Sequence, residues 1–292
     1  MRFCITESMT DPSYFPTLAR TAEDLGYDGM MVPDSICYPA EADTSYPYNG
    51  DGTREFLDEK PFIEPMSLIP WLAAITERLE FVTSVVKLPI RHPVLVAKQV
   101  SSVAVITSNR LVYGVGTSPW PEDFRVVEIP WEHRGRRMDE QIDIIRKLCA
   151  GGFVEHHGEF YDFPAVKLCP VPTQPIPIII GCHGDAAIRR AARIGDGWTA
   201  AGADDDFLAH AISRLNELRK EAGRDHLPFR ILLGSVAGFD PDGVKRLTDQ
   251  GVTDLYVGFR DPYVAGPDTQ SLDEKVGMLH WYAENVLAKV RS

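Results

Sequence analysis

Short apolar runs alternate with longer amphipathic segments along the chain. The short runs are rich in β-branched residues and have the length of buried strands. We predict strands at Phe3–Thr6, Gly29–Val32, Glu80–Val86, Leu111–Gly116, Pro177–Gly181, Gly197–Ala201, Phe229–Val236 and Asp254–Gly258.

After each of these runs, apolar residues recur at the three- to four-residue spacing of an amphipathic helix. Several of these segments end at a glycine, such as Gly26, Gly195 and Gly251, which is a common helix terminator. The predicted helices are Tyr14–Leu25, Glu64–Thr76, Pro93–Thr107, Gly135–Cys149, Asp185–Ile194, Asp204–Ala222, Asp240–Gln250 and Ser271–Val290.

The alternation predicts parallel strands, because each helix returns the chain to the same edge of the sheet. Eight such units in 292 residues predict an α/β fold, a closed (β/α)8 TIM barrel that forms a single domain over residues 1–292. An open doubly wound sheet is the alternative, but it would normally carry a Gly-x-Gly-x-x-Gly turn after an early strand. Glu7-Ser8-Met9-Thr10 stands there instead, so we favour the barrel.

Two segments interrupt the alternation. Ser35–Phe62, after the second predicted strand, is rich in Tyr, Pro, Asp and Gly, and loops of this length are often functional. We expect it to form a lid over the barrel mouth. Phe153–Pro175 predicts a β-hairpin inserted before the fifth strand.

Composition and charge exclude several classes of protein. Hydrophobic residues make up 44% of the chain, which is enough for a packed core. The net charge of −12 and the lack of a Lys/Arg run argue against nucleic-acid binding. Scattered cysteines without a Cys-x-x-Cys pair, and the lack of a signal peptide or a membrane-length apolar run, predict a cytoplasmic protein without a membrane partner.

In a (β/α)8 barrel the chemistry lies at the C-terminal ends of the strands. His183 is the only histidine at such an end, and no Gly-x-Ser-x-Gly elbow occurs, so we expect neither a metal site nor a serine nucleophile. The glycine-rich corners at 114–118 and 181–185 can admit a flat ligand and an anion. Ordinary strand-to-helix turns are the alternative interpretation of each corner.

Several motifs occur in an order and spacing that resemble a known family. They are Ala22-Glu23-x-x-Gly26-Tyr27-Asp28-Gly29, Val32-Pro33-Asp34, Arg78–Val85, Leu88-Pro89-x-Arg91-x-Pro93, Asn109–Thr117, Arg134–Glu140, Pro177–Gly181 and Ala191–Trp198. Over nearly its whole length the chain resembles the bacterial luciferase-like flavin and deazaflavin oxidoreductases, in the branch that uses coenzyme F420.

This resemblance implies a ring-binding site at the barrel mouth. The third strand would lie against the ring, with a non-proline cis peptide at Ser84–Val85, and the turn before the helix at Asp185 would hold the cofactor phosphate. It also implies a small-molecule substrate and a homodimer. The predicted cofactor-binding residues are Thr83, Ser84, Val85, Gly116, Thr117, Ser118, Gly181, Cys182, His183 and Gly184.

The chain departs from the family pattern at two places. Many relatives carry Asp-His after the second strand, whereas this chain carries Asp34-Ser35, which we take as the candidate catalytic residues. The sugar-phosphate dehydrogenases of the family carry a glutamate shortly after the Gly-x-Gly-Thr turn. Here Ser118-Pro119 follows and the nearest acid is Glu122, so we do not expect that activity.

We therefore expect hydride transfer between coenzyme F420 and a small organic substrate. An FMN-dependent monooxygenase and a cofactor-binding barrel without turnover are the alternatives. Because F420 carries an acidic tail, we expect a positive patch at the mouth from Lys87, Arg91 and Arg260, with His183 beside it. Aromatic residues predict a partly apolar cavity, with Trp71 expected in the core. They are Tyr38, Tyr46, Tyr48, Phe56, Trp71 and Trp120.

Overall fold

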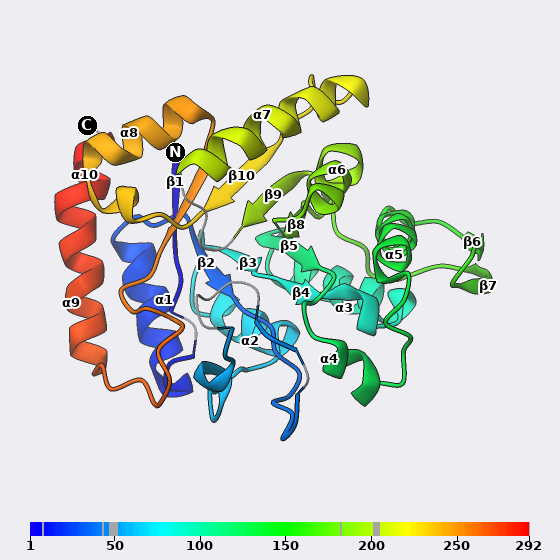
Figure 1. Cartoon of the computed structure of the whole chain (residues 1–292), viewed down its shortest axis with the longest axis horizontal. Coiled ribbons are helices and arrows are strands. Elements are labelled where there is room, and N and C mark those ends of the chain that lie inside the picture. Colours follow the sequence, from blue (N-terminus) through cyan, green and yellow to red (C-terminus); the bar gives the residue numbers. More distant parts are fainter. Residues whose placement is uncertain (8, 43, 47–51, 182, 201–204, 292) are drawn as a thin grey trace.

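A computed structural model describes the chain except for residues 8, 43, 47–51, 182, 201–204 and 292. Within that part, eight parallel barrel strands close on themselves, as the sequence predicts (Figure 1). The two ends of the sheet join because β3 pairs with β5. The strands are β1 (Arg2–Ile5), β2 (Gly29–Val32), β3 (Glu80–Thr83) with its continuation β4 (Val86–Lys87), β5 (Leu111–Gly116), β8 (Ile178–Gly181), β9 (Gly197–Ala200), β10 (Arg230–Leu233) and β11 (Asp254–Val257).

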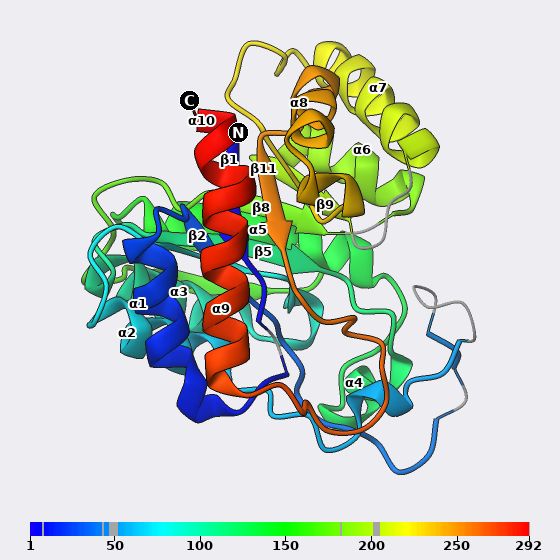
Figure 2. The ribbon, with the colours of Figure 1, turned by 90° about the vertical axis from the view of Figure 1, so that its left-hand side faces the viewer.

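Helices surround the barrel, and Figures 1 and 2 both show the last long helix, α9, lying beside α1. A π-helical turn, Ala283–Leu287, joins α9 to α10, so the single helix predicted over Ser271–Val290 is interrupted. The helices are α1 (Phe15–Asp24), α2 (Pro65–Ala73), α3 (Pro93–Ile106), α4 (Pro121–Val126), α5 (Arg134–Cys149), α6 (Asp185–Ile194), α7 (Asp205–Glu221), α8 (Pro241–Gln250), α9 (Leu272–Tyr282) and α10 (Ala288–Arg291).

The hairpin predicted within Phe153–Pro175 is confirmed. Its antiparallel strands are β6 (Val154–His157) and β7 (Asp162–Val166), which project away from the barrel in Figure 1. His156 lies 2.9 Å from the carboxylate of Glu140 on α5, so an imidazole–carboxylate contact ties the hairpin to the barrel.

Two predicted strands are too long. The strand predicted over Glu80–Val86 breaks at Ser84–Val85, where the peptide bond is cis, as the resemblance implies. The strand predicted over Phe229–Val236 ends at Leu233. A 3-10 turn begins at Val236, because the Ser235 hydroxyl accepts a hydrogen bond from the amide of Ala237.

Alternate residues of the strands build two cores. Successive side chains of a strand point to opposite faces, so Phe81 packs under the helices whereas Val82 points into the barrel. Burial on both faces explains the continuous apolar runs of the sequence. The barrel interior is filled by Cys4, Met31, Val82, Val112, Ile179 and Leu232, with Tyr256 packed against them.

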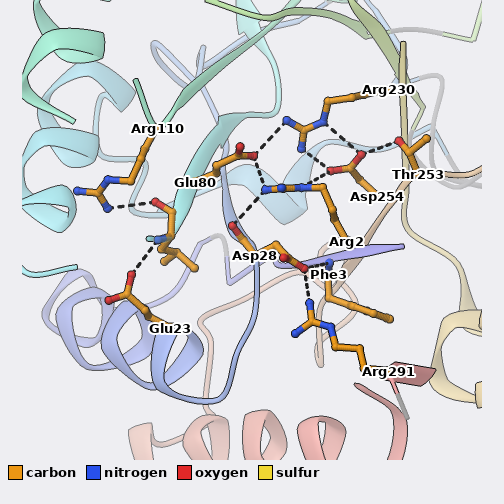
Figure 3. A network of polar contacts seen from close by, with 11 residues as sticks. Arg2, Phe3, Glu23, Asp28, Glu80, Arg110, Arg230, Thr253, Asp254 and Arg291 are labelled. Atoms are coloured by element: carbon orange, nitrogen blue, oxygen red, sulfur yellow. Dashed lines mark hydrogen bonds and ion pairs between the residues drawn. The ribbon is translucent and has the colours of Figure 1, made fainter. Parts of the chain in front are cut away.

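Ion pairs close the N-terminal end of the barrel (Figure 3). Arg2 lies 2.6 Å from the Glu80 carboxylate and 3.3 Å from the Asp254 carboxylate. Arg230 also pairs with both acids. Desolvation by burial lowers the pKa of Arg230, but the hydrogen bond and charge of Asp254 outweigh it, so the pKa is raised above its usual value. Two arginines therefore balance two carboxylates at this end.

Gly114 marks a close approach between β3 and β5. A Cβ atom on Gly114 would lie 1.9 Å from the carbonyl oxygen of Thr83. The Thr83 hydroxyl in turn donates a 2.8 Å hydrogen bond to the Gly114 carbonyl oxygen. The third barrel strand can therefore bend toward its neighbour only because residue 114 has no side chain.

We expect Gly114→Ala to lower the free energy of unfolding by roughly 2–3 kcal/mol, because the new methyl group must displace backbone. Gly277→Ala is the matched control, since a Cβ atom on Gly277 of α9 would point into open space. That variant should be stabilised by about 0.5–1 kcal/mol through higher helix propensity. Urea denaturation measures both changes, and equal stabilities for the two variants would contradict this account.

Candidate active site

A pocket of about 310 Å³ opens at the C-terminal end of the barrel, within the size range of small-molecule sites (roughly 300–1,000 Å³). Its wall comes from strand ends, from the segment after β2 and from the loop after β11. The lining residues are Thr6, Met9, Met31, Pro33, Asp34, Ser35, Tyr46, Phe56, Leu57, Phe62, Ser84, Val85, Lys87, Gly116, Thr117, Ser118, Pro119, Trp120, Gly181, His183, Thr199, Ala200, Tyr256, Pro262 and Tyr263.

The pocket brings together most of the residues predicted from the sequence. Thr83 and Gly184 lie beside the wall, since the Thr83 side chain is turned to Gly114 and Gly184 is the N-cap of α6. Cys182 lies outside the described residues. The candidates that line the pocket are Asp34, Ser35, Ser84, Val85, Gly116, Thr117, Ser118, Gly181 and His183.

Ser84 and Val85 line the pocket and are called its floor below, and Val85 packs against two glycines. A Cβ atom on Gly116 would lie 2.8 Å from one methyl group of Val85, and a Cβ on Gly181 would lie 2.8 Å from the other. The sequence interpretation assigned these glycines to the close approach of a ligand. The structure gives them a further role, because their missing side chains make room for Val85 itself.

Asp34 connects the loop after β2 to the end of the third barrel strand. Its carboxylate accepts hydrogen bonds from the Lys87 amide at 3.0 Å and from the Arg91 guanidinium at 2.8 Å. The Asp34 side chain is almost completely buried. These contacts hold Lys87 and Arg91 in place just after the pocket floor. Asp34 therefore acts on the site by positioning these two residues.

Ser118 begins a second polar chain at the mouth. Its hydroxyl donates a 2.8 Å hydrogen bond to Asp123 and accepts one from the Trp120 amide at 3.0 Å. The same Asp123 carboxylate lies 2.8 Å from the ammonium group of Lys87. Lys87 therefore lines the pocket with its charge already balanced.

The expected positive patch at the mouth is not supported, because each of the three cations that should form it has an acidic partner. Lys87 pairs with Asp123, and Arg91 pairs with Asp34. The Arg260 guanidinium lies 3.9 Å from Asp268. Asp123 is in α4 and Asp34 follows β2, so sequence position alone does not reveal that they pair with Lys87 and Arg91.

The described part of Ser35–Phe62 packs against α4 at the mouth, and Figure 2 shows both at the same end of the barrel. The Thr44 hydroxyl donates a 3.1 Å hydrogen bond to Glu122, whose carboxylate also lies 3.7 Å from the Arg54 guanidinium. The Arg54 guanidinium stacks over the Trp120 ring at 4.9 Å. These contacts attach the segment to α4 beside the pocket.

Four aromatic rings form one wall of the pocket. Tyr46 stacks on Trp120 with ring centroids 5.1 Å apart, and it also contacts Phe56 and Tyr263. Of the other aromatic residues expected in the cavity, Tyr48 lies outside the described residues. The expectation that Trp71 is a core residue is wrong, because its side chain is 48% exposed on α2.

Part of the pocket wall was not predicted from the sequence. Thr199 and Tyr256 could have been found, because the inward-pointing alternation of β9 and β11 leads to them. The Tyr256 hydroxyl donates a 3.1 Å hydrogen bond to the Ala200 carbonyl, and burial raises the pKa of Tyr256 to about 12. Tyr263 reaches the pocket from an irregular loop, and no local sequence pattern indicates that position.

Neither a metal cluster nor a membrane span is found in the part of the chain that the structure describes. There, His, Cys, Asp and Glu side chains do not gather in threes as metal ligands would. Among the same residues, each helix is too short or too polar to cross a bilayer.

The fold is a (β/α)8 barrel, and the pocket at its C-terminal end has the size of a small-molecule site. The family model for luciferase-like monooxygenases matches residues 3–260. The chain belongs to this family.

Proteins similar to this chain carry different descriptions. The chain is 54% identical over 290 residues to the uncharacterized protein Rv0940c of Mycobacterium tuberculosis, covering 99% of this chain and 100% of that protein. It is 29% identical over 254 residues to an F420-dependent glucose-6-phosphate dehydrogenase of Nakamurella multipartita, covering 82% and 67%. Among solved structures, monooxygenase RslO1 from Streptomyces bottropensis aligns over 99% of both chains with a TM-score of 0.78 and 19% identity, which indicates a shared fold.

We expect Arg54→Ala to loosen the segment after β2, because the variant loses both the Glu122 pair and the stack on Trp120. Cleavage by chymotrypsin within Ser35–Phe62 should become about fivefold faster, the factor equivalent to about 1 kcal/mol of local stability. Arg125→Ala is the control, since Arg125 also pairs with Glu122 but belongs to α4 itself. Equal cleavage rates in the two variants would remove the lid interpretation.

Proposed function

We propose that the protein is an F420-dependent oxidoreductase that transfers a hydride between the deazaflavin and a small organic substrate. The observation that carries the proposal is that Ser84, Val85 and four aromatic rings line one pocket at the C-terminal end of a luciferase-like barrel. The relative from Nakamurella multipartita, which is named as F420-dependent, supports the choice of cofactor.

The described residues suit a flat ring and a phosphate. Val85 offers an apolar surface, and Thr117 with Ser118 lies at its edge. Gly181 and His183 lead to the start of α6, where backbone amides at a helix N-terminus favour an anion. We therefore assign the ring to Ser84, Val85 and residues 116–118, and the phosphate to the turn from Gly181 to Gly184.

The described residues position the ligands, offer them apolar surface and provide a hydrogen-bond donor. When bound, the deazaflavin supplies the carbon that carries the hydride. Asp34 holds the floor in place through Lys87 and Arg91, and the aromatic wall offers apolar surface to a bound substrate. Ser35 lines the pocket, where its hydroxyl can donate a hydrogen bond to a substrate oxygen.

We expect the purified protein to bind F420 at least tenfold more tightly than FMN, a difference equivalent to about 1.4 kcal/mol. Titration of each cofactor, followed by its fluorescence, measures this preference. Gly181→Val should weaken F420 binding about tenfold, because its side chain would displace Val85. Gly277→Ala, far from the pocket in α9, should leave the affinity unchanged.

Tighter binding of FMN would contradict the F420 assignment. It would instead favour a flavin monooxygenase, the second candidate, which the family description and the fold shared with monooxygenase RslO1 support.

We also propose a homodimer, since α2 and α3 carry exposed apolar side chains at Trp71, Leu95 and Ile106. Light scattering should give twice the chain mass of 32.6 kDa. Trp71→Glu should shift the mass toward the monomer, whereas Trp281→Glu, at an equally exposed position of α9, should not. A monomeric mass for the unaltered protein would exclude the dimer.

A further inference from the structure

We infer that the substrate part of this pocket takes a flat, uncharged aromatic carbonyl compound and rejects phosphorylated or carboxylated substrates. The carbonyl group of this substrate rests on the proposed function. The preference for an uncharged ring rests only on the aromatic rings and paired charges that line the pocket.

The aromatic wall favours a flat ligand. Tyr46 and Trp120 are nearly parallel, with 13° between their ring planes. Phe56 and Tyr263 meet edge to face at 84°, with centroids 5.2 Å apart. Phe56 is almost completely buried, so its ring is fixed before any ligand arrives. Preorganised rings bind a planar aromatic molecule by stacking and edge contacts.

The Lys87 and Asp34 side chains that line the pocket already have charge partners within the protein. The Lys87 ammonium is satisfied by Asp123 at 2.8 Å, and the Asp34 carboxylate by Arg91 at 2.8 Å. The residues outside the described part include no lysine or arginine in the sequence, so they cannot supply a further cation of that kind.

His183 is the remaining basic residue of the described wall. It lies beside the start of α6, where we assign the cofactor phosphate, and its ring packs 5.3 Å from that of Phe207. Arg54 stacks over Trp120, but it pairs with Glu122 at 3.7 Å and is not among the lining residues. An anionic substrate would therefore enter the aromatic part of the pocket without a cation of the described wall to pair with. Burial of an unpaired charge is costly, and this cost opposes binding of such a substrate.

The carbonyl group follows from the proposed chemistry. In the reducing direction, bound reduced F420 would supply a hydride, with its electron pair, to the carbonyl carbon. The π electrons of the C=O bond would move to oxygen, which would take a proton from water. The ring N–H proton of the cofactor would neutralise the hydroxide left behind, so that the products are an alcohol and oxidised F420. No charged group on the substrate is needed for this step.

The direct test compares two ligands of the same ring system. Calorimetric titration of the cofactor-free protein with 2-acetonaphthone and with 6-acetyl-2-naphthoic acid measures the effect of one carboxylate. We expect the neutral ketone to bind at least tenfold more tightly, and glucose 6-phosphate to give no binding. Equal or tighter binding of the acid, or saturable binding of glucose 6-phosphate, would overturn the inference.

A change of charge gives a second test. Asp123→Asn releases Lys87 from its partner, so the affinity for the naphthoic acid should rise about tenfold relative to the ketone. The double variant Asp123→Asn/Lys87→Met should lose that gain. An unchanged preference in folded Asp123→Asn would contradict the assigned role of the Lys87–Asp123 pair.

The aromatic wall is tested independently of these charges. Tyr46→Ala should weaken binding of 2-acetonaphthone about five- to tenfold. The control is Phe153→Ala, because Phe153 is exposed next to the β6–β7 hairpin. This variant should bind the ketone as tightly as the unaltered protein. Equal affinities in the two variants would exclude a stacked ligand.

Turnover separates this inference from the proposed function. Tight binding of the ketone without oxidation of reduced F420 would contradict the proposed function and leave the ligand class standing. Turnover of anionic substrates with F420, without binding of the ketone, would support the proposed function and contradict the inferred ligand class.

Discussion

The site depends on the close packing of the third barrel strand against the two strands that follow it in the barrel. Gly114 lets the Thr83 carbonyl approach, and the empty positions at Gly116 and Gly181 accept the methyl groups of Val85. Protein interiors are packed so densely that a single methyl group in any of these places forces atoms to move. The floor of the pocket is therefore fixed by the absence of three side chains.

Charged residues have different roles at the two ends of the barrel. At the N-terminal end, Arg2 and Arg230 share the carboxylates of Glu80 and Asp254, and this network closes the barrel (Figure 3). At the C-terminal end, charged pairs stand beside an open pocket, and Lys87 contributes to its wall. Because the cations nearest the pocket are paired with acids, the net charge of −12 does not describe the environment of a bound ligand.

The sequence predicted the barrel because each strand is apolar on both faces and each helix has one apolar side. It also located the pocket, since turns such as the one after β5 must lie at the C-terminal end of a parallel barrel. The pairing of Lys87 with Asp123 was not predictable, because Lys87 is in β4 and Asp123 is in α4, and the approach of these two elements depends on tertiary packing. Tyr263 was missed for the same reason. Trp71 was misassigned because helical spacing alone does not distinguish a buried face from an exposed one.

The most direct measurement is a crystal structure of the protein with F420 bound. The account predicts that the deazaflavin ring lies on Val85, between residues 116–118 and the aromatic wall, with its phosphate at the start of α6. A second cavity of about 750 Å³, lined by Tyr113, Cys149 and Phe229 among others, lies elsewhere in the protein. Density for the ring in that cavity, with the pocket above Val85 empty, would contradict the account.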